Sequence, residues 1–147
     1  MKRAVLGIAV FLIFCNTGVS AAEHFGVTVY PGARSDDAAK AYCAVFGPES
    51  IRQTREMFKN AVDGGAFCYR TSDAFEKVVA YYKAQKGVEP LGAPSVRGAS
   101  KAVVFCKAGM QCASVGDGVD ITISTPWSVG KAVNKDVLIT FRKVSPK

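Results

Sequence analysis

The chain has one histidine, His24, and it stands beside a predicted cleavage site. If a signal peptidase cuts after Ala21, the mature chain begins Ala22-Glu23-His24, with histidine in third position. A free amino group, two backbone amide nitrogens and this imidazole then supply four nitrogens in one plane, which suits Cu(II) or Ni(II). Cleavage after Ala22 puts the histidine second and removes that geometry. His24 is therefore a candidate metal ligand for only one of the two cleavage sites.

Nucleophilic catalysis would also depend on His24, because a Ser–His or Cys–His pair needs an imidazole. The sequence contains no Gly-x-Ser-x-Gly motif, phosphate-binding loop or dinucleotide fingerprint. The adjacent Asp36 and Asp37 are typical of a helix start. Asp117 and Asp120 lie near a turn that offers too few oxygen ligands for calcium. We therefore expect no catalytic residues and no cofactor.

Four cysteines, Cys43, Cys68, Cys106 and Cys112, follow the N-terminal segment, and an even number in an exported chain indicates two disulfides. Four cysteines allow three pairings. We favour Cys106–Cys112, because five residues that include a glycine can close a short loop between them, which leaves Cys43 with Cys68. The spacing lacks both the C-x₂₋₄-C pattern of zinc sites and the C-x-x-C pattern of redox pairs.

The N-terminus has the layout of a secretory signal peptide. Lys2 and Arg3 precede an uncharged run over residues 4–14, and small residues follow at 19–22. The run is shorter than the roughly 20 apolar residues that cross a bilayer. A retained membrane anchor, or a lipid on Cys15, fits less well. We expect residues 1–21 to be a signal peptide and residues 22–147 to form one periplasmic or secreted domain without a transmembrane segment.

The formal net charge of +7 falls to +5 when the two cations of the signal segment are removed. A basic protein is attracted to anionic surfaces. The cations are scattered singly and no aromatic residues alternate with them in a nucleic-acid motif. We therefore expect a generally cationic surface whose partner is an envelope protein or an anionic polymer, and no specific nucleic-acid binding.

Two helical regions are predicted. The first begins at Asp36–Asp37 and runs to Gly64-Gly65, either as two helices or as one bent at Gly47-Pro48. The second begins at a capping box of Asp73 and Glu76 and ends at Gly87. Its buried face is predicted to consist of Phe75, Val78, Val79 and Tyr82.

Strands are expected mainly in the second half. The strand-like runs are residues 27–30, 66–71, 101–107, 119–125 and 137–142, and residues 88–100 form a loop rich in proline and glycine. The sequence therefore predicts an α+β fold: a mainly antiparallel sheet of about four or five strands with two or three helices packed on it.

One face of that sheet is expected to be solvent-exposed, because polar and apolar residues alternate between 119 and 124. Thr122, Thr140 and Arg142 would lie on this face with Trp127 at its edge, and together they form the candidate binding surface. A tryptophan at a strand end more often caps the core than anchors a ligand, so both roles stay open for Trp127. Side chains alternate between the two faces of a strand, so if Cys68 faces the helices, Phe67 and Tyr69 must point away from them. This conflicts with helices on one face only, because two aromatic side chains would then be exposed. Either helices cover both faces or the strand is bulged.

Five segments together resemble an uncharacterised family of small secreted bacterial proteins. They are Val29-Tyr30-Pro31-Gly32-Ala33, Tyr69–Asp73, Lys77–Lys83, Ile121–Trp127 with its Pro-Trp pair, and Asp136–Thr140 with its Asp-x-Leu-Ile pattern. The resemblance implies one compact secreted domain. It implies no activity and no catalytic residues, and the four cysteines are not part of it.

Three functions remain. The leading expectation is a secreted, non-catalytic domain that binds a protein or an anionic envelope component. The second is an amino-terminal Cu(II)- or Ni(II)-binding protein, and the third is an enzyme of unknown type.

Overall fold

The computed structural model describes residues 22–59, 62–110, 112–113 and 117–147. The predicted signal segment, residues 1–21, lies outside this range. No helix in the described part of the chain is long and apolar enough to cross a membrane.

Two helices and ten strands make up the described chain, which confirms the α+β prediction. The helices are α1 (Asp37–Phe58) and α2 (Phe75–Ala84). The strands are β1 (Glu23–His24), β2 (Val27–Thr28), β3 (Val62–Thr71), β4 (Val88–Pro90), β5 (Ser95–Arg97), β6 (Ser100–Lys107), β7 (Gly118–Thr125), β8 (Trp127–Val129), β9 (Ala132–Asn134) and β10 (Val137–Pro146).

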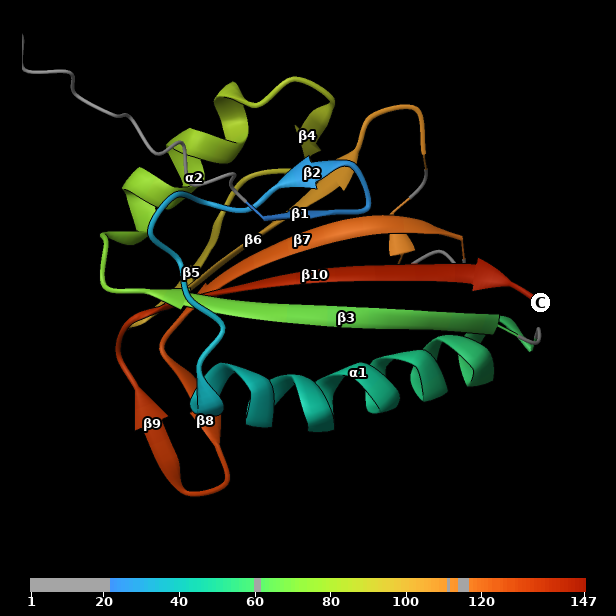
Figure 1. Cartoon of the computed structure of the whole chain (residues 1–147), viewed down its shortest axis with the longest axis horizontal. Helices are drawn as coiled ribbons and strands as arrows, with labels where there is room; N and C mark the ends of the chain where they lie inside the picture. The colour runs from blue at the N-terminus through green and yellow to red at the C-terminus, as the bar shows by residue number, and fades with distance from the viewer. Residues whose placement is uncertain (1–21, 60–61, 111, 114–116) are drawn as a thin grey trace, which may run out of the picture.

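The main sheet is antiparallel and has six strands in the order β3-β10-β7-β6-β4, with β5 also paired to β6. Its first strand in the chain, β3, lies at one edge beside its last, β10. After β3 the chain crosses through α2 to the opposite edge and returns through β6, β7 and β10 (Figure 1). The hairpin β8–β9 is an insertion between β7 and β10.

The two helices lie on opposite faces of the sheet (Figure 1). Cys68 and Arg70 face α1, whereas Tyr69 packs into the core on the other face with the β1–β2 hairpin. This arrangement resolves the parity conflict without a bulge, because helices cover both faces.

The larger core lies between the sheet and α2. Phe105, Ile121, Ile123 and Phe141 are fully buried there against Tyr82. Full burial of such a side chain stabilises a protein by about 1.5–3 kcal/mol. The predicted inward residues of β7 and the predicted buried face of α2 are both confirmed.

Helix α1 is a single helix that continues through Gly47 and Pro48. Asp36 is its N-cap and accepts a hydrogen bond from the Ala39 amide at 3.2 Å. The predicted stop at Gly64-Gly65 is wrong, since both glycines belong to β3 and the helix ends at Phe58. Pairing with β10 outweighs the low strand propensity of glycine.

The predicted capping box of α2 is also wrong. Ala74 occupies the N-cap position, and no side chain caps the helix. Asp73 instead accepts a hydrogen bond from the Tyr30 hydroxyl at 2.6 Å and pairs with Lys77. The hydrogen bond with Tyr30, which is distant in the sequence, therefore replaces the expected capping contact with the start of α2. Residues 88–100, expected to be a loop, include the short strands β4 and β5.

Both favoured cysteine pairings are present. Cys43 of α1 is bonded to Cys68 of β3, with their Cα atoms 5.7 Å apart. Cys106 of β6 is bonded to Cys112, with a Cα separation of 5.0 Å. The first bond ties α1 to the sheet edge and the second closes a short loop after β6.

Gly64 allows a close approach between β3 and β10. A Cβ atom at this position would collide with the backbone carbonyl oxygen of Lys143. We expect Gly64→Ala to lower the free energy of unfolding by about 1–3 kcal/mol, because backbone atoms must shift to admit the methyl group. Denaturant titration measures this change.

Gly65→Ala is the matched control for that substitution. Nothing lies within 4 Å of a Cβ atom built on Gly65. Its alanine variant should change the free energy of unfolding by no more than about 1 kcal/mol. Equal losses in the two variants would show that steric contact with Lys143 is not the cause.

Candidate functional site

The predicted binding surface lies on one face of the sheet, but that face is not open. Thr140 pairs with Thr122 across β10 and β7, so these side chains do share a face. However, Thr140 is 3% exposed and Trp127 is 4% exposed. Because α1 and the β8–β9 region cover this side, the expected exposed surface is corrected to a mostly buried one.

Arg142 is engaged in an ion pair with Asp120 on the same face. Its Nη2 lies 2.5 Å from Asp120 Oδ2, and Nε is 3.2 Å from the same oxygen. Burial raises the pKa of the Asp120 carboxyl, and the Arg142 guanidinium opposes that rise. The pair neutralises two charges inside the fold, so Arg142 is not a free cation for an anionic partner.

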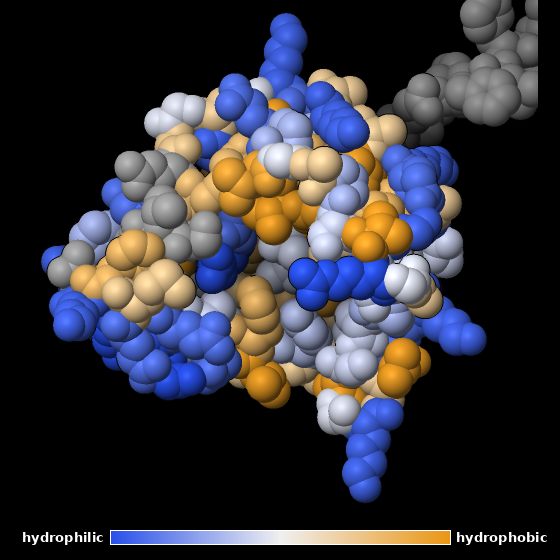
Figure 2. All heavy atoms as spheres, turned by 180° about the vertical axis from the view of Figure 1, so that it is seen from behind, coloured by the Kyte–Doolittle hydropathy of each residue, from blue (hydrophilic) through white to orange (hydrophobic). Residues whose placement is uncertain are grey.

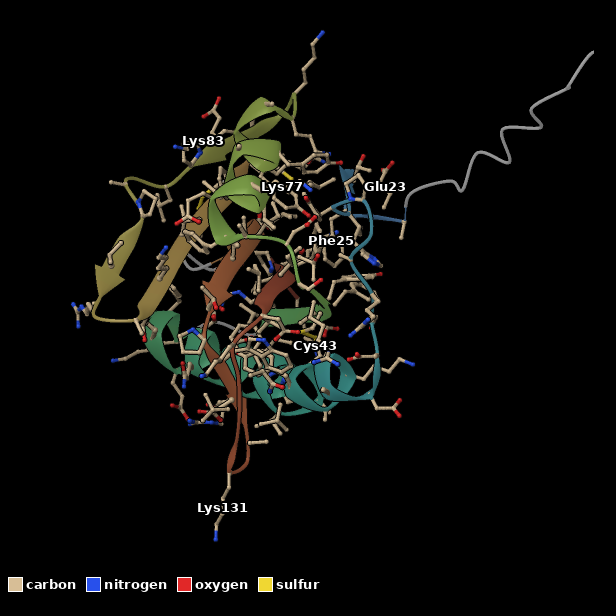
Figure 3. All side chains as sticks on the ribbon, turned by 90° about the vertical axis from the view of Figure 1, so that its left-hand side faces the viewer. Glu23, Phe25, Cys43, Lys77, Lys83 and Lys131 are labelled. Carbon is tan, nitrogen blue, oxygen red and sulfur yellow. A yellow bond between two sulfur atoms is a disulfide. The ribbon has the colours of Figure 1, made fainter. Side chains whose placement is uncertain are left out.

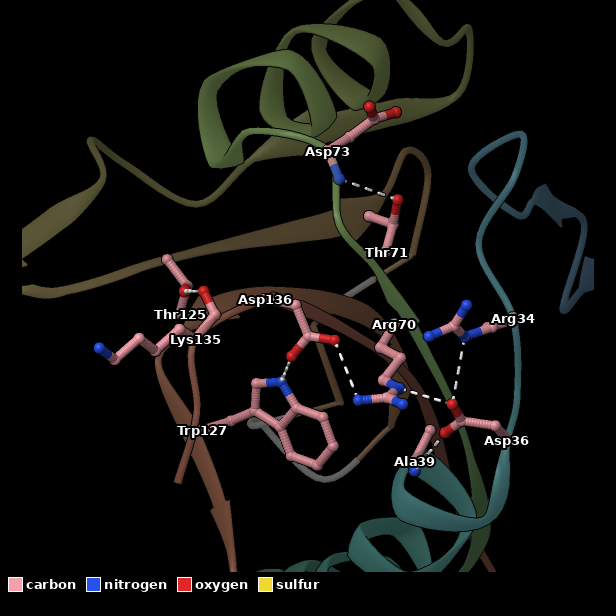
Figure 4. Close-up of polar contacts among 10 residues, drawn as sticks. All are labelled: Arg34, Asp36, Ala39, Arg70, Thr71, Asp73, Thr125, Trp127, Lys135 and Asp136. Atoms are coloured by element: carbon pink, nitrogen blue, oxygen red, sulfur yellow. Dashed lines mark hydrogen bonds and ion pairs between the residues drawn. The ribbon is translucent and has the colours of Figure 1, made fainter. Parts of the chain in front are cut away.

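Trp127 belongs to a polar network that joins three elements (Figure 4). Its indole N–H donates to Asp136 at 2.9 Å, and Asp136 accepts a second hydrogen bond from Arg70 at 3.2 Å. Arg70 also donates to Asp36 at 2.6 Å. The network links the start of α1, the end of β3, the start of β8 and the chain entering β10, and it fixes the buried indole in place.

His24 is packed into the fold. Its ring stacks on Phe67 with a centroid distance of 3.9 Å, and Nε2 shares a hydrogen bond with the Tyr69 hydroxyl at 2.5 Å. Glu23 and His24 form β1, and the Val29 amide donates to the Ala22 carbonyl at 2.8 Å. Figure 3 shows this hairpin, with Glu23 and Phe25, against the body of the protein.

The copper and nickel hypothesis concerns a chain cleaved after Ala21 and stays a prediction; with β1 paired to β2 and His24 stacked on Phe67, metal binding would first have to release this hairpin. Planar coordination would need the backbone nitrogens of Glu23 and His24 together with an unpacked imidazole. No group of three or more His, Cys, Asp or Glu residues in the described ranges is placed to hold a metal ion.

Packing of His24 makes stability depend on pH. Burial lowers the pKa of its imidazole below 6.5, so the unfolded chain binds the proton more readily than the folded chain. The stability that the packed, neutral His24 imidazole contributes is fully present above pH 6.5, and it is lost as the pH falls through the lower pKa of the folded state. We expect urea unfolding to show lower stability at pH 5.5 than at pH 7.5, and His24→Gln to remove that slope. An unchanged slope in the variant would contradict this assignment.

A groove runs between α1 and the outer edge of β3, and we call it the edge groove. Its pocket has a volume of about 450 Å³. It is lined by Cys43, Gly47, Pro48, Ile51, Arg52, Arg55, Gly64, Gly65 and Ala66. Gly47 lies opposite Ala66, since a Cβ atom built on it would be 3.5 Å from the Ala66 methyl group, an ordinary van der Waals contact.

The backbone of β3 presents hydrogen-bonding groups to this groove. Along an antiparallel strand, one residue directs both its N–H and its C=O to the strand on one side, and the next residue directs both to the other side. Arg70 exchanges two hydrogen bonds with Arg34, at 3.0 and 2.9 Å, on the side away from β10. By the same alternation, the backbone N–H and C=O groups of Cys68, Ala66 and Gly64 also point away from β10.

Ala66 is the open position on this edge. Cys68 is 2% exposed, and the Gly64 amide is occupied by the Asp63 carboxylate at 2.8 Å. The outward N–H and C=O of Ala66 have no hydrogen-bond partner among the described residues. An unpaired edge of this kind can accept a further strand.

Two arginines of α1 line the groove in different states. Arg52 is paired with Glu49 and Glu56, and its hydrogen bonds lower the pKa of Glu49 to about 2. Arg55 instead donates from Nη2 to the Val62 carbonyl at 3.1 Å and pairs with no carboxylate among the described residues. Arg55 is therefore the cation that remains for an anionic ligand.

Other hollows are more apolar. One of about 280 Å³ lies between α1 and the β8–β9 hairpin, and one of about 530 Å³ lies between α2 and β5. Seen from the side opposite Figure 1, apolar residues form small separate groups among hydrophilic ones (Figure 2). The second hollow is bordered by Lys83 of α2 and by Lys101, which pairs with Glu76.

Sequence reasoning missed the edge groove. Its signal was present in Asp63-Gly64-Gly65-Ala66, a glycine pair directly before a strand. A glycine pair in this position equally fits the end of the preceding helix. Only the pairing of β3 with β10 shows that they belong to an edge strand.

The fold and the edge groove define a small α+β domain with a helix on each face of one sheet and an open sheet edge. No known protein family, curated protein or solved structure matches the chain.

Proposed function

We propose that this chain is a periplasmic or secreted, non-catalytic domain that binds a partner protein in the edge groove. The observation that carries the proposal is the outward backbone of Ala66, which no described residue pairs with, beside a pocket of about 450 Å³. Addition of a strand to an exposed sheet edge is a common mode of peptide recognition, because backbone hydrogen bonds supply affinity and adjacent pockets supply specificity.

Export is supported by the basic, apolar and small residues of the N-terminal segment and by the two cysteine pairs. Disulfides persist in oxidising compartments such as the bacterial periplasm. The resemblance to small secreted bacterial proteins points the same way. These features support a function outside the cytoplasm.

A protein partner fits the groove better than an anionic polymer does. A polyanion is held mainly by clustered cations. Here Arg52 is already neutralised by Glu49 and Glu56, and Arg142 by Asp120. The distinctive feature of the groove is its backbone edge, which only another polypeptide backbone matches.

Photo-crosslinking in cells tests the proposal. Benzoylphenylalanine placed at Ile51 in the groove should form a discrete protein adduct, whereas the same probe at the exposed Ala84 of α2 should not. The adduct should disappear when Ala66→Pro removes the outward N–H. Proline fits an edge strand where its missing N–H faces away from the partner strand. An adduct that survives Ala66→Pro would contradict binding at this edge.

A further inference from the structure

We infer that the edge groove takes the free C-terminal end of a partner polypeptide, laid antiparallel to β3 with its carboxylate on Arg55. This inference rests on the proposed function and specifies the ligand class of the same groove.

The direction of the bound strand follows from the contact that the edge already makes. Arg34 pairs with Arg70 as an antiparallel bridge on the outer side of β3. A peptide continuing in that direction runs from Ala66 toward Val62, so its last residues lie at the beginning of β3. Four strand residues span about 13 Å, enough for two or three peptide residues beyond the one opposite Ala66.

Arg55 stands where such a peptide ends. Its Nη2 is 3.1 Å from the Val62 carbonyl oxygen, which fixes the guanidinium at the start of β3. A guanidinium has five N–H donors, so the remaining ones can bind a carboxylate in charge-assisted hydrogen bonds. The neighbouring Arg52 is already bound by two glutamates.

The groove also specifies a side chain. Paired residues on adjacent strands place their side chains on the same face. The Ala66 methyl group faces Gly47 of α1, so the opposing peptide residue points toward the same helix. Pro48 and Ile51 line that part of the pocket. The ligand is therefore an extended C-terminus with an apolar residue two or three positions before its end.

The test uses NMR on the ¹⁵N-labelled protein purified from the periplasm with its disulfides formed. The probe is the acetylated hexapeptide Thr-Val-Thr-Val-Ala-Val with a free carboxylate, and the control is the same peptide with a C-terminal amide. We expect the Ala66 amide signal to shift, with about tenfold weaker binding of the amide form. Arg55→Gln should make the two peptides equal, whereas Arg52→Gln should retain the preference.

The outcomes separate the inference from the proposed function. Equal shifts of Ala66 with both peptides would overturn recognition of a C-terminus and keep the groove as a peptide site. Shifts confined to other surfaces, or none with either peptide, would overturn both. A dimer in sedimentation that Ala66→Pro abolishes would make a second copy the occupant and overturn the inference.

Discussion

Arg142→Ala is expected to lower the free energy of unfolding by about 3–5 kcal/mol, measured by denaturant titration at pH 7. The substitution leaves the Asp120 carboxylate, 2% exposed, without its partner inside the fold. Removing one member of a buried ion pair is costly because the remaining charge is neither solvated nor neutralised. The loss should shrink at acidic pH. Burial already raises the pKa of Asp120, so without Arg142 the carboxyl can bind a proton and become neutral.

Two further variants test whether the loss of stability comes from the burial of the Asp120 charge or from the loss of any ion pair. The double variant Asp120→Leu/Arg142→Met should unfold with a free energy close to that of the wild type, since it removes both charges and keeps the volume. Arg52→Ala removes two exposed ion pairs, with Glu49 and Glu56, and should cost far less than Arg142→Ala because solvent already screens these charges. A small loss in Arg142→Ala would mean that solvent reaches Asp120 and that this face of the sheet is open.

Removal of the Cys43–Cys68 bond should have the second large effect. The two residues are 25 positions apart, and closing a loop of that size stabilises a protein by about 3.5 kcal/mol on the chain-entropy model. We expect Cys43→Ala/Cys68→Ala to lower the free energy of unfolding by about this amount. Because Cys43 lines the edge groove, the variant should also weaken binding of the hexapeptide probe.

Cys106→Ala/Cys112→Ala provides the comparison, because these residues are only 6 positions apart. On the same model, this variant should lower the free energy of unfolding by about 1 kcal/mol less than Cys43→Ala/Cys68→Ala does. This second pair lies outside the edge groove, so peptide binding should be retained. If both double variants bind the peptide equally well, the bond between α1 and β3 does not shape the groove.

Local sequence patterns predicted much of the fold. The spacing of Phe75, Val78, Val79 and Tyr82 identified the buried face of α2, because helical periodicity does not depend on distant contacts. The alternation in β7 identified Ile121 and Ile123 as core residues for the same reason. The two cysteine pairings followed from loop length and from elimination.

Errors arose where a distant partner replaced a local one. Asp73 has the position of a helix cap but binds Tyr30, 43 residues away in the chain. Gly64 and Gly65 have the composition of a helix stop but pair with β10. Trp127 stands at a strand end, where a tryptophan either anchors a ligand or caps the core; here it is buried beside Tyr42 of α1, and Asp136 accepts its indole N–H.

Periodicity and short-range spacing along the chain predict an α+β domain, the favoured cysteine pairs and the inward residues of α2 and β7, because none of these features depends on distant contacts. The three-dimensional fold was needed to show that α1 covers the polar face of the sheet, that Asp120 pairs with Arg142, and that Ala66 lies on an open edge. These features depend on strand order and register, which bring together residues that no local pattern relates.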